Sequence, residues 1–321
     1  MSDIDPLMRE ASSLLRTHGV GSGKLIPADG FANTVLMTPS HVIRLNTGRF
    51  PHAFAHEACV LAHLPEALPH PHVVAQGNRQ TDGEFLILER LPGQNLELVW
   101  PELSARDHRE IGRQLGSHLR TLHEFTPAAW MENRWVEDVV ASGRWGDGYH
   151  LPPSTIPQAI ASASEGRPDL EVLLGQLAAL VDDRSWAFRT NFHGFIHTDV
   201  HLRNILISDT CITGLIDFEG SRIGPIDGEL DQLVRFMLNS EGPMETDYAP
   251  FIAGIRDTYP ALLGHPDLIP RLEIYEAQWH LVQLHHWRPG ATWTNDPAQG
   301  LDAIIAGQFG KRVQRLLIDR R

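Results

Sequence analysis

The chain of 321 residues has only two cysteines, Cys59 and Cys211, and no long apolar segment. Two cysteines cannot form the disulfide framework of a small secreted protein, so we expect a reducing compartment. No apolar segment approaches the roughly 20 residues that a membrane-spanning helix requires. Residues 1–6 lack the basic start, followed by an apolar stretch, that is typical of a signal peptide. These absences predict a cytoplasmic protein without a membrane partner.

Basic residues are also scarce, because 27 lysines and arginines stand against 40 aspartates and glutamates, for a net charge of −13. A nucleic-acid partner is therefore not expected, since phosphate binding requires a basic surface. An acidic surface would favour the approach of a cationic substrate, but solubility alone also explains it, and we favour that explanation. The 18 histidines show no His-Glu-x-x-His spacing, so a zinc site is not expected.

A Walker-type phosphate loop is missing as well. Glycines at 19, 21 and 23 precede Lys24, but the motif requires glycine at position 18 and serine or threonine after the lysine. His18 and Leu25 stand at those positions, so we interpret the run as the end of a helix that leads into a strand. The polar turn at residues 28–33 has a single glycine, which makes it a weak nucleotide loop by itself.

The spacing of apolar residues predicts an α+β chain whose strands dominate the beginning and whose helices dominate the remainder. Its length suits two lobes. Helices are predicted at 4–18, 54–64, 104–123, 170–181 and 228–237, and strands at 24–26, 34–37, 42–45, 84–91, 205–207 and 212–216.

The most informative stretch is residues 195–221, which places His197, Asp199 and Asn204 on one short loop and Asp217 after an apolar run. The two predicted strands between Asn204 and Asp217 form a hairpin that brings these two residues side by side. One aspartate can accept the proton of an attacking hydroxyl, while Asn204 and Asp217 can supply oxygen ligands for Mg²⁺ on nucleotide phosphates. The pattern therefore predicts metal-assisted phosphoryl transfer.

The run His-Thr-Asp-Val-His-Leu-Arg-Asn at 197–204 resembles the H-x-D-x-x-x-x-N loop of the aminoglycoside phosphotransferase and choline kinase family, small-molecule relatives of the protein kinases. Asp217-Phe218-Glu219 stands where that family has Asp-Phe/Trp-Glu. The resemblance implies a bilobal protein-kinase-like fold, with a small β-rich N-lobe at 1–91 and a larger, mainly helical C-lobe at 92–321. It also implies Mg²⁺-dependent transfer of the γ-phosphoryl group of ATP, with GTP as an alternative donor, to a hydroxyl group of a small molecule.

The same resemblance implies roles for residues of the loop and its surroundings. Asp199 is the expected catalytic base, and Asn204 and Asp217 are the expected metal ligands. His197 is expected to brace the loop by hydrogen bonding. Glu229 is expected to tether it, although the helix dipole also favours an acidic residue in the first turn of a helix.

Nucleotide-binding residues are implied in the first lobe. Arg44 stands where the kinase fold usually has its phosphate-binding lysine, and Glu57 matches the glutamate that pairs with this basic residue. Arginine can bind phosphate bidentately, but its geometry is not interchangeable with that of lysine. The apolar strand before the Pro-Gly break resembles the connector between the lobes. Leu88 is therefore expected to flank the adenine, and Glu89 and Leu91 to present carbonyl and amide groups.

The acceptor site is the least determined part of the resemblance. Glu219, Glu276 and Trp279 are candidate contacts. The segment 126–168 carries aromatic residues that suit sugar rings or flat drug scaffolds, although packing in the core is the simpler explanation, which we favour. These aromatic residues are Trp130, Trp135, Trp145 and Tyr149.

Three classes of function follow. The first is a phosphotransferase that modifies an aminoglycoside or another hydroxyl-bearing antibiotic, and so confers antibiotic resistance. The second is a metabolite kinase for choline, homoserine or a sugar amine. The third is a non-catalytic nucleotide-binding module, which Arg44 and the glycine-poor turn support but which the presence of Asp199, Asn204 and Asp217 argues against. A protein kinase is less favoured because no Ala-Pro-Glu segment follows Asp217.

Overall fold

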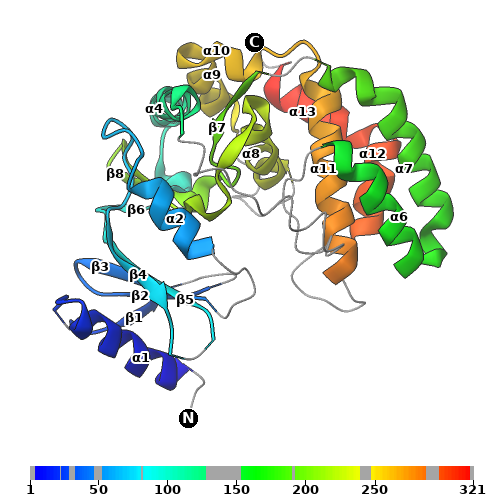
Figure 1. Ribbon diagram of the computed structural model, residues 1–321. Helices are drawn as coiled ribbons and strands as arrows, with labels where there is room; N and C mark the ends of the chain where they lie inside the picture. The colour runs from blue at the N-terminus through cyan, green and yellow to red at the C-terminus, as the bar shows by residue number, and fades with distance from the viewer. Residues whose placement is uncertain are drawn as a thin grey trace.

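The computed structural model describes residues 4–21, 23–28, 33–46, 53–80, 82–127, 153–189, 192–238, 247–286 and 296–318. Within them, a sheet-rich N-terminal part is followed by a mostly helical remainder (Figure 1). This is the α+β division that the sequence predicts, whereas a boundary between residues 91 and 92 stays a prediction. None of the helices described in these ranges is both long and apolar enough to cross a membrane.

The N-terminal part is built on a five-stranded antiparallel sheet with the strand order β1-β2-β3-β5-β4. Helix α1 (Ile4–Thr17) packs on one face of this sheet and α2 (Ala53–Leu61) lies toward the helical part, as Figure 1 shows. The strands are β1 (Ile26–Ala28), β2 (Thr34–Met37), β3 (His41–Leu45), β4 (Val73–Asn78) and β5 (Glu84–Glu89).

Strand β5 is buried on both faces, which explains its continuous apolar sequence. Phe85 and Ile87 pack with α1 in one cluster. Leu86 and Leu88 instead join the main core, which includes α2 and the helices of the C-terminal part. Successive side chains of a strand point to opposite faces, so one strand can contribute to two cores only if every position is apolar.

The C-terminal part contains two small antiparallel sheets, with the orders β6-β8-β9 and β10-β7. Their strands are β6 (Gln94–Asn95), β7 (His193–Ile196), β8 (Ile205–Ser208), β9 (Cys211–Leu215) and β10 (Arg222–Pro225). The helices around them are α3 (Leu96–Val99), α4 (Ala105–Glu124), α6 (Ile156–Gly166), α7 (Glu171–Arg184), α8 (Glu229–Leu238), α9 (Ala249–Thr258), α10 (Pro260–Leu263), α11 (Leu268–His286), α12 (Pro297–Ile305) and α13 (Gln308–Leu317).

Helix α4 begins where the sequence predicts, because Ser104 caps it. The side chain of Ser104 accepts a hydrogen bond from the amide of Asp107, and the carboxylate of Asp107 accepts one from the amide of Ser104. This reciprocal arrangement satisfies two backbone donors that a helix start leaves unpaired.

Helix α11 is buried over much of its length although it carries charged side chains. Arg271 donates two hydrogen bonds to Asp227, at 2.5 and 2.8 Å. Glu276 accepts a hydrogen bond of 2.7 Å from Arg235 of α8, which also donates one of 2.7 Å to Asp231. A buried charge is tolerated only when it is paired and hydrogen-bonded. These pairs therefore fix α11 in one position against α8 and the residues just before it.

Two helical glycines differ in the space around them, so we expect opposite effects when each is replaced by alanine. A Cβ atom at Gly112 of α4 would lie 2.1 Å from the carbonyl oxygen of Phe251 of α9, whereas at Gly175 of α7 nothing outside its own helix lies within 4 Å. We expect Gly112→Ala to destabilise the protein by about 1–3 kcal/mol or more, because backbone must move. Gly175→Ala should stabilise it by about 0.4–1 kcal/mol, because alanine restricts the unfolded chain. Urea unfolding measures both, and equal effects would contradict this account of the two glycines.

Candidate active site

The loop between β7 and β8 and the segment after β9 meet as the sequence predicts. The β8–β9 hairpin pairs Ile205 with Leu215, and just beyond it the amide of Ile216 donates a hydrogen bond of 3.1 Å to the carbonyl oxygen of Asn204. Asp217 follows directly. The hairpin therefore brings the backbone of Asn204 next to that of Asp217, although twelve residues separate them in the sequence.

Asn204 holds the carboxylate of Asp199. Its side-chain nitrogen donates hydrogen bonds of 2.9 Å to the backbone oxygen and to Oδ2 of Asp199. The Asn204 side chain therefore has its amide nitrogen committed to Asp199, and its carbonyl oxygen is the atom that suits a metal ion. The side chain of Asp199 is 37% exposed, so a substrate hydroxyl can reach it.

His197 has the hydrogen bonds that a bracing role requires. Its imidazole accepts a hydrogen bond of 3.3 Å from the amide of Asp199 at Nδ1 and lies 2.9 Å from the carbonyl oxygen of Ile216 at Nε2. An acceptor at Nδ1 means that Nε2 carries the proton and donates it to Ile216. The ring is fully buried against Phe218, with ring centroids 4.3 Å apart. His197 thus connects the catalytic loop to the segment that precedes Asp217.

Glu229 fixes the first two residues of the same loop. Its carboxylate accepts hydrogen bonds from the amides of His197, at 2.7 Å, and Thr198, at 2.9 Å. Nε2 of His123, at the end of α4, lies 3.1 Å from the same carboxylate, and the hydroxyl of Tyr259 lies 3.1 Å from Nδ1 of His123. Burial acts to raise the pKa of Glu229, but the contacts with His123 and His197 outweigh it and lower the pKa below its usual value.

Two residues that flank the site have left-handed backbone conformations. Thr198 has φ 76° and Asp217 has φ 72°, a region that costs a residue other than glycine about 1–3 kcal/mol. The hydrogen bond from the Thr198 amide to Glu229 offsets the cost at Thr198. Next to Asp217, the amide of Phe218 donates a hydrogen bond of 3.2 Å to Glu57. Buried carboxylates therefore hold both strained turns in place.

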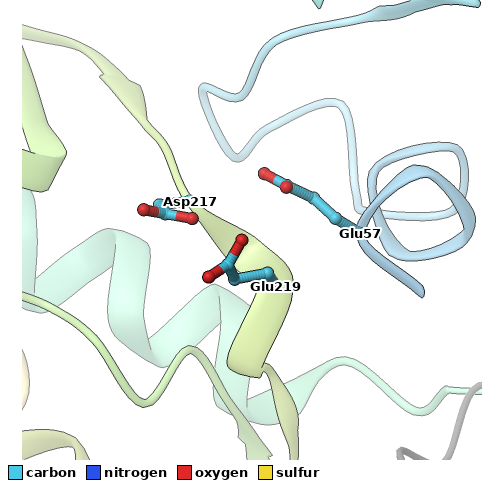
Figure 2. Close-up of side chains that lie close together, drawn as sticks. All are labelled: Glu57, Asp217 and Glu219. Atoms are coloured by element: carbon cyan, nitrogen blue, oxygen red, sulfur yellow. The ribbon is translucent and has the colours of Figure 1, made fainter. Parts of the chain in front are cut away.

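Arg44 of β3 lies among three carboxylates. One nitrogen of its guanidinium lies 2.5 Å from Glu57 of α2, and the other lies 2.9 Å from Asp217 and 2.8 Å from Glu219. Figure 2 shows that the three carboxylates point toward a common region between α2 and the segment after β9. The guanidinium also lies over the ring of Phe54, 4.8 Å from its centroid. The predicted pairing of Arg44 with Glu57 is confirmed.

The charges of this cluster shift one another's pKa values. Burial lowers the pKa of Arg44, but the carboxylates of Asp217, Glu57 and Glu219 outweigh it, and the pKa lies above its usual value. Burial raises the pKa of Glu57 despite the nearby Arg44. Burial and the neighbouring Asp217 likewise raise the pKa of Glu219, whose side chain is 26% exposed. More negative charge is gathered here than one arginine neutralises.

The donor set of the site fits a hard divalent cation. Glu57, Asp217 and Glu219 each offer a carboxylate oxygen, and these oxygens lie within 4.8 Å of one another. Mg²⁺ is bound through such oxygens together with substrate phosphates. Asp217, a predicted metal ligand, belongs to this group, and the ligand roles of Asp217 and Asn204 stay predictions.

The connector between the two parts uses some of its backbone groups internally. The amide of Glu89 donates a hydrogen bond of 2.9 Å to His72, and that of Arg90 donates one of 2.9 Å to Ser40. The amide of Glu89 is therefore already used within the protein. Leu91 packs on the β8–β9 hairpin, since a Cβ atom at Gly214 would lie 2.3 Å from its Cδ1. The buried Leu88 belongs to the main core, and contacts of these residues with adenine stay predictions.

Glu219 contacts two residues of the N-terminal part of the chain. Its carboxylate accepts hydrogen bonds from Arg44, at 2.8 Å, and from Asn33, at 3.3 Å. The sequence alone suggests an acceptor contact. The acceptor contact of Glu219 stays a prediction.

Glu276 and Trp279 lie in the helical part. Glu276 is 1% exposed, with Arg235 on one oxygen and His280 3.1 Å from the other. Its burial corrects the prediction of an open acceptor contact, because these partners surround the carboxylate. Trp279 is half-buried, with its ring centroid 4.5 Å from the guanidinium of Arg235, and its acceptor contact stays a prediction. The aromatic candidates Trp130, Trp135, Trp145 and Tyr149 lie outside the described residues.

Sequence reasoning missed two contributors to the site. His123 contacts Glu229, which lies 106 residues further along the chain. Asp231 pairs with Arg235 of the same helix. The spacing of four residues between Asp231 and Arg235 is a signal that could have found the second contact. No local pattern could have found the first.

Comparison with known proteins agrees with this geometry. A model of the phosphotransferase enzyme family matches residues 26–264. The structure is similar to the GDP complex of aminoglycoside 2′-phosphotransferase-IIIa, with a TM-score of 0.68 and 17% identity over 95% of this chain and 99% of that chain. The structure is also similar to the gentamicin complex of APH(2″)-IIa, with a TM-score of 0.65 and 15% identity over 100% of this chain and 98% of that chain.

A thermostable mutant of APH(4)-Ia, in a ternary complex with ADP and hygromycin B, gives a TM-score of 0.56 and 17% identity over 92% of this chain and 97% of that chain. No curated protein sequence matches the chain. At these identities the structural likeness shows the fold, and it confirms the predicted bilobal kinase-like architecture.

Glu229→Gln should destabilise the protein by about 1.5–3 kcal/mol near neutral pH, because an amide group replaces one charged acceptor of the loop amides. The pKa of Glu229 is lowered in the folded state. Its contribution is therefore present above the unfolded value of about 4.3 and is lost as the pH falls through the folded value. The difference from wild type should then be smaller at about pH 3 than at about pH 7.

Denaturant unfolding at both pH values checks this expectation. The control is Glu124→Gln. The side chain of Glu124, which follows His123 at the end of α4, is 72% exposed, so this change should alter stability by less than about 0.5 kcal/mol. A difference for Glu229→Gln that did not change with pH would contradict the assigned hydrogen bonds.

Arg44→Met should destabilise the protein by about 3–5 kcal/mol, because it leaves buried carboxylates without their cation. Arg44→Lys keeps the charge but lacks the planar fork that reaches Glu57 and Glu219 together, so its loss should be smaller but measurable. Arg109→Met is the control, because Arg109 pairs with Asp257 at a position that is 55% exposed and should cost less than about 1 kcal/mol. Chemical unfolding of the three variants at neutral pH measures this order, and comparable losses for Arg44→Met and Arg109→Met would refute it.

Proposed function

The chain belongs to the phosphotransferase enzyme family and is an ATP-dependent small-molecule kinase, and we propose that its acceptor is a hydroxyl group of an aminoglycoside or another antibiotic. The observation that carries the reaction is the position of Asp199, whose carboxylate is held by Asn204 and open to solvent. Arg44, Asp217 and Asn204 are the proposed phosphate and metal side of the site.

In the proposed mechanism the carboxylate of Asp199 accepts a hydrogen bond from the acceptor hydroxyl and aims its oxygen at the γ-phosphorus. As the new oxygen–phosphorus bond forms, the hydroxyl proton passes to Asp199. The bond from the γ-phosphorus to the bridging oxygen breaks, and ADP leaves with the electron pair. Positioning and charge stabilisation provide most of the rate enhancement in such reactions.

We propose that Arg44, and a Mg²⁺ ion held by Asn204 and Asp217, balance the negative charge of the nucleotide phosphates. Arg44 donates to the nucleotide phosphates, a role that a planar guanidinium performs bidentately. Asn204 and Asp217 would hold Mg²⁺, which when bound neutralises charge on the phosphate oxygens. Glu57 keeps Arg44 in place, and Glu229 and His197 keep the loop of Asp199 in place through the contacts described above.

The antibiotic acceptor is supported by similarity and charge. Solved structures of similar fold include complexes with streptomycin, gentamicin and hygromycin B. The net charge of −13 suits a cationic acceptor. A metabolite kinase for choline, homoserine or a sugar amine is the alternative that the same catalytic groups support. We propose a cytoplasmic location, where ATP is supplied, and GTP as an alternative donor, since similar structures hold GDP.

One experiment tests the proposal. Turnover of ATP with Mg²⁺ is measured across aminoglycosides, other hydroxyl-bearing antibiotics, choline, homoserine and amino sugars, and product mass identifies the phosphorylated compound. We expect an antibiotic to be phosphorylated, and Asp199→Ala to lower that turnover on the order of 10²–10⁴-fold with little change in nucleotide affinity. Phosphorylation of a metabolite alone would overturn the antibiotic proposal. Absence of any turnover, with stabilisation by Mg·ATP in a thermal shift, would favour a binding module.

A further inference from the structure

We propose that His201 is a positioning residue for the reaction, and that it orients Asp199 through a hydrogen bond from its Nε2–H group. The inference rests on the proposed function, because it names the partner of the catalytic base. His201 lies in the loop between Asp199 and Asn204, and its Nε2 is 3.5 Å from Oδ1 of Asp199. Catalytic hydrogen bonds are often long without substrate and shorten in the complex.

The backbone determines which nitrogen of His201 carries the proton. The amide of Arg203 donates a hydrogen bond of 3.2 Å to Nδ1 of His201. A backbone amide can only donate, so Nδ1 must be an unprotonated acceptor and the neutral ring carries its hydrogen on Nε2. This hydrogen lies on the side of the ring that faces Asp199.

The neighbouring amide of Asn204 does not compete for the same role. Its side-chain nitrogen lies 3.3 Å from Nε2 of His201, but this nitrogen already donates at 2.9 Å to the backbone oxygen and to Oδ2 of Asp199. Its two hydrogens are thereby used. The group near Nε2 that can accept a hydrogen bond is therefore the carboxylate of Asp199.

Packing fixes the plane of the His201 ring. The ring stacks on Phe236 of α8, with centroids 5.4 Å apart and planes 5° from parallel, and its side chain is only 13% exposed. Phe236 is 1% exposed and belongs to the main core. The ring therefore keeps its plane, and the hydrogen bond from the Arg203 amide to Nδ1 opposes a half-turn that would move Nε2 away from Asp199.

Two donors then act on the two oxygens of Asp199, Asn204 on Oδ2 and His201 on Oδ1. A carboxylate held at one oxygen can still swing about its terminal torsion, which is soft, whereas one held at both keeps a single plane. Asn204 is also a predicted metal ligand. His201 is a donor whose direction the chain alone fixes.

The first test reads the tautomer of His201 without any turnover. Long-range ¹H–¹⁵N NMR spectra of the imidazoles in the nucleotide-free protein are compared with those of His201→Gln, in which one set of ring signals is absent. We expect that set to show the pattern of a neutral ring protonated on Nε2. A ring protonated on Nδ1 would overturn the proposal, because Nε2 would then have no hydrogen to donate.

The second test separates positioning from a general loosening of the loop. His201→Ala should lower kcat by about 10- to 100-fold, the value of a lost hydrogen bond to a charged group, while KM for ATP changes little. His201→Gln places an amide donor near Asp199 and should recover most of the lost turnover. Arg203→Ala is the control, because it removes the ion pair with Glu97 but keeps the backbone amide. It should stay within about twofold of wild type.

Equal losses in His201→Ala and His201→Gln, or an equal loss in Arg203→Ala, would overturn the positioning role. A wild-type protein with no kinase turnover would contradict the proposed function instead, and the NMR result would still decide the tautomer of His201. The failure of one inference is thereby distinguishable from the failure of the other.

Discussion

The site depends on one electrostatic constraint, the placement of a single buried guanidinium among three carboxylates. Arg44 connects β3 to α2 through Glu57 and to the segment after β9 through Asp217 and Glu219. One positive charge against three carboxylates leaves two formal negative charges when all are ionised. Burial raises the pKa values of Glu57 and Glu219, and the neighbouring Asp217 raises them further. A divalent cation carries the charge that would balance these two negative charges, so the demand for such an ion is already present in the protein without nucleotide.

A second carboxylate, Glu229, does for the catalytic loop what Glu57 does for Arg44. It is buried, it accepts hydrogen bonds from two consecutive amides, and it holds Thr198 in a conformation that the residue would not otherwise adopt. Arg44 and the loop of Asp199 are thus held in place by two buried carboxylates, Glu57 and Glu229, for which no contact with substrate is proposed. This division explains why Asp199 can stay 37% exposed and still keep a defined direction.

The parts of the site that could be predicted from the sequence are those whose residues are contiguous or joined by a short hairpin. Asp199 and Asn204 share one loop, and a hairpin returns the chain to Asp217, so their proximity follows from strand pairing. The pair of Arg44 and Glu57 could be inferred by resemblance. The position of Glu219 could not, because it depends on a left-handed turn at a residue other than glycine. The burial of Glu276 likewise depends on α8 lying against α11, which no local pattern specifies.

Strand β5 has a consequence for how the molecule behaves as a whole. Its alternate side chains belong to different cores, and Leu86 and Leu88 share theirs with residues of the helical part, such as Leu122 and Leu215. The two parts are therefore not separate modules that a linker joins. An isolated N-terminal fragment would expose to water the apolar side chains of β5 and α2 that pack on the helical part. The two parts should accordingly unfold in a single cooperative transition.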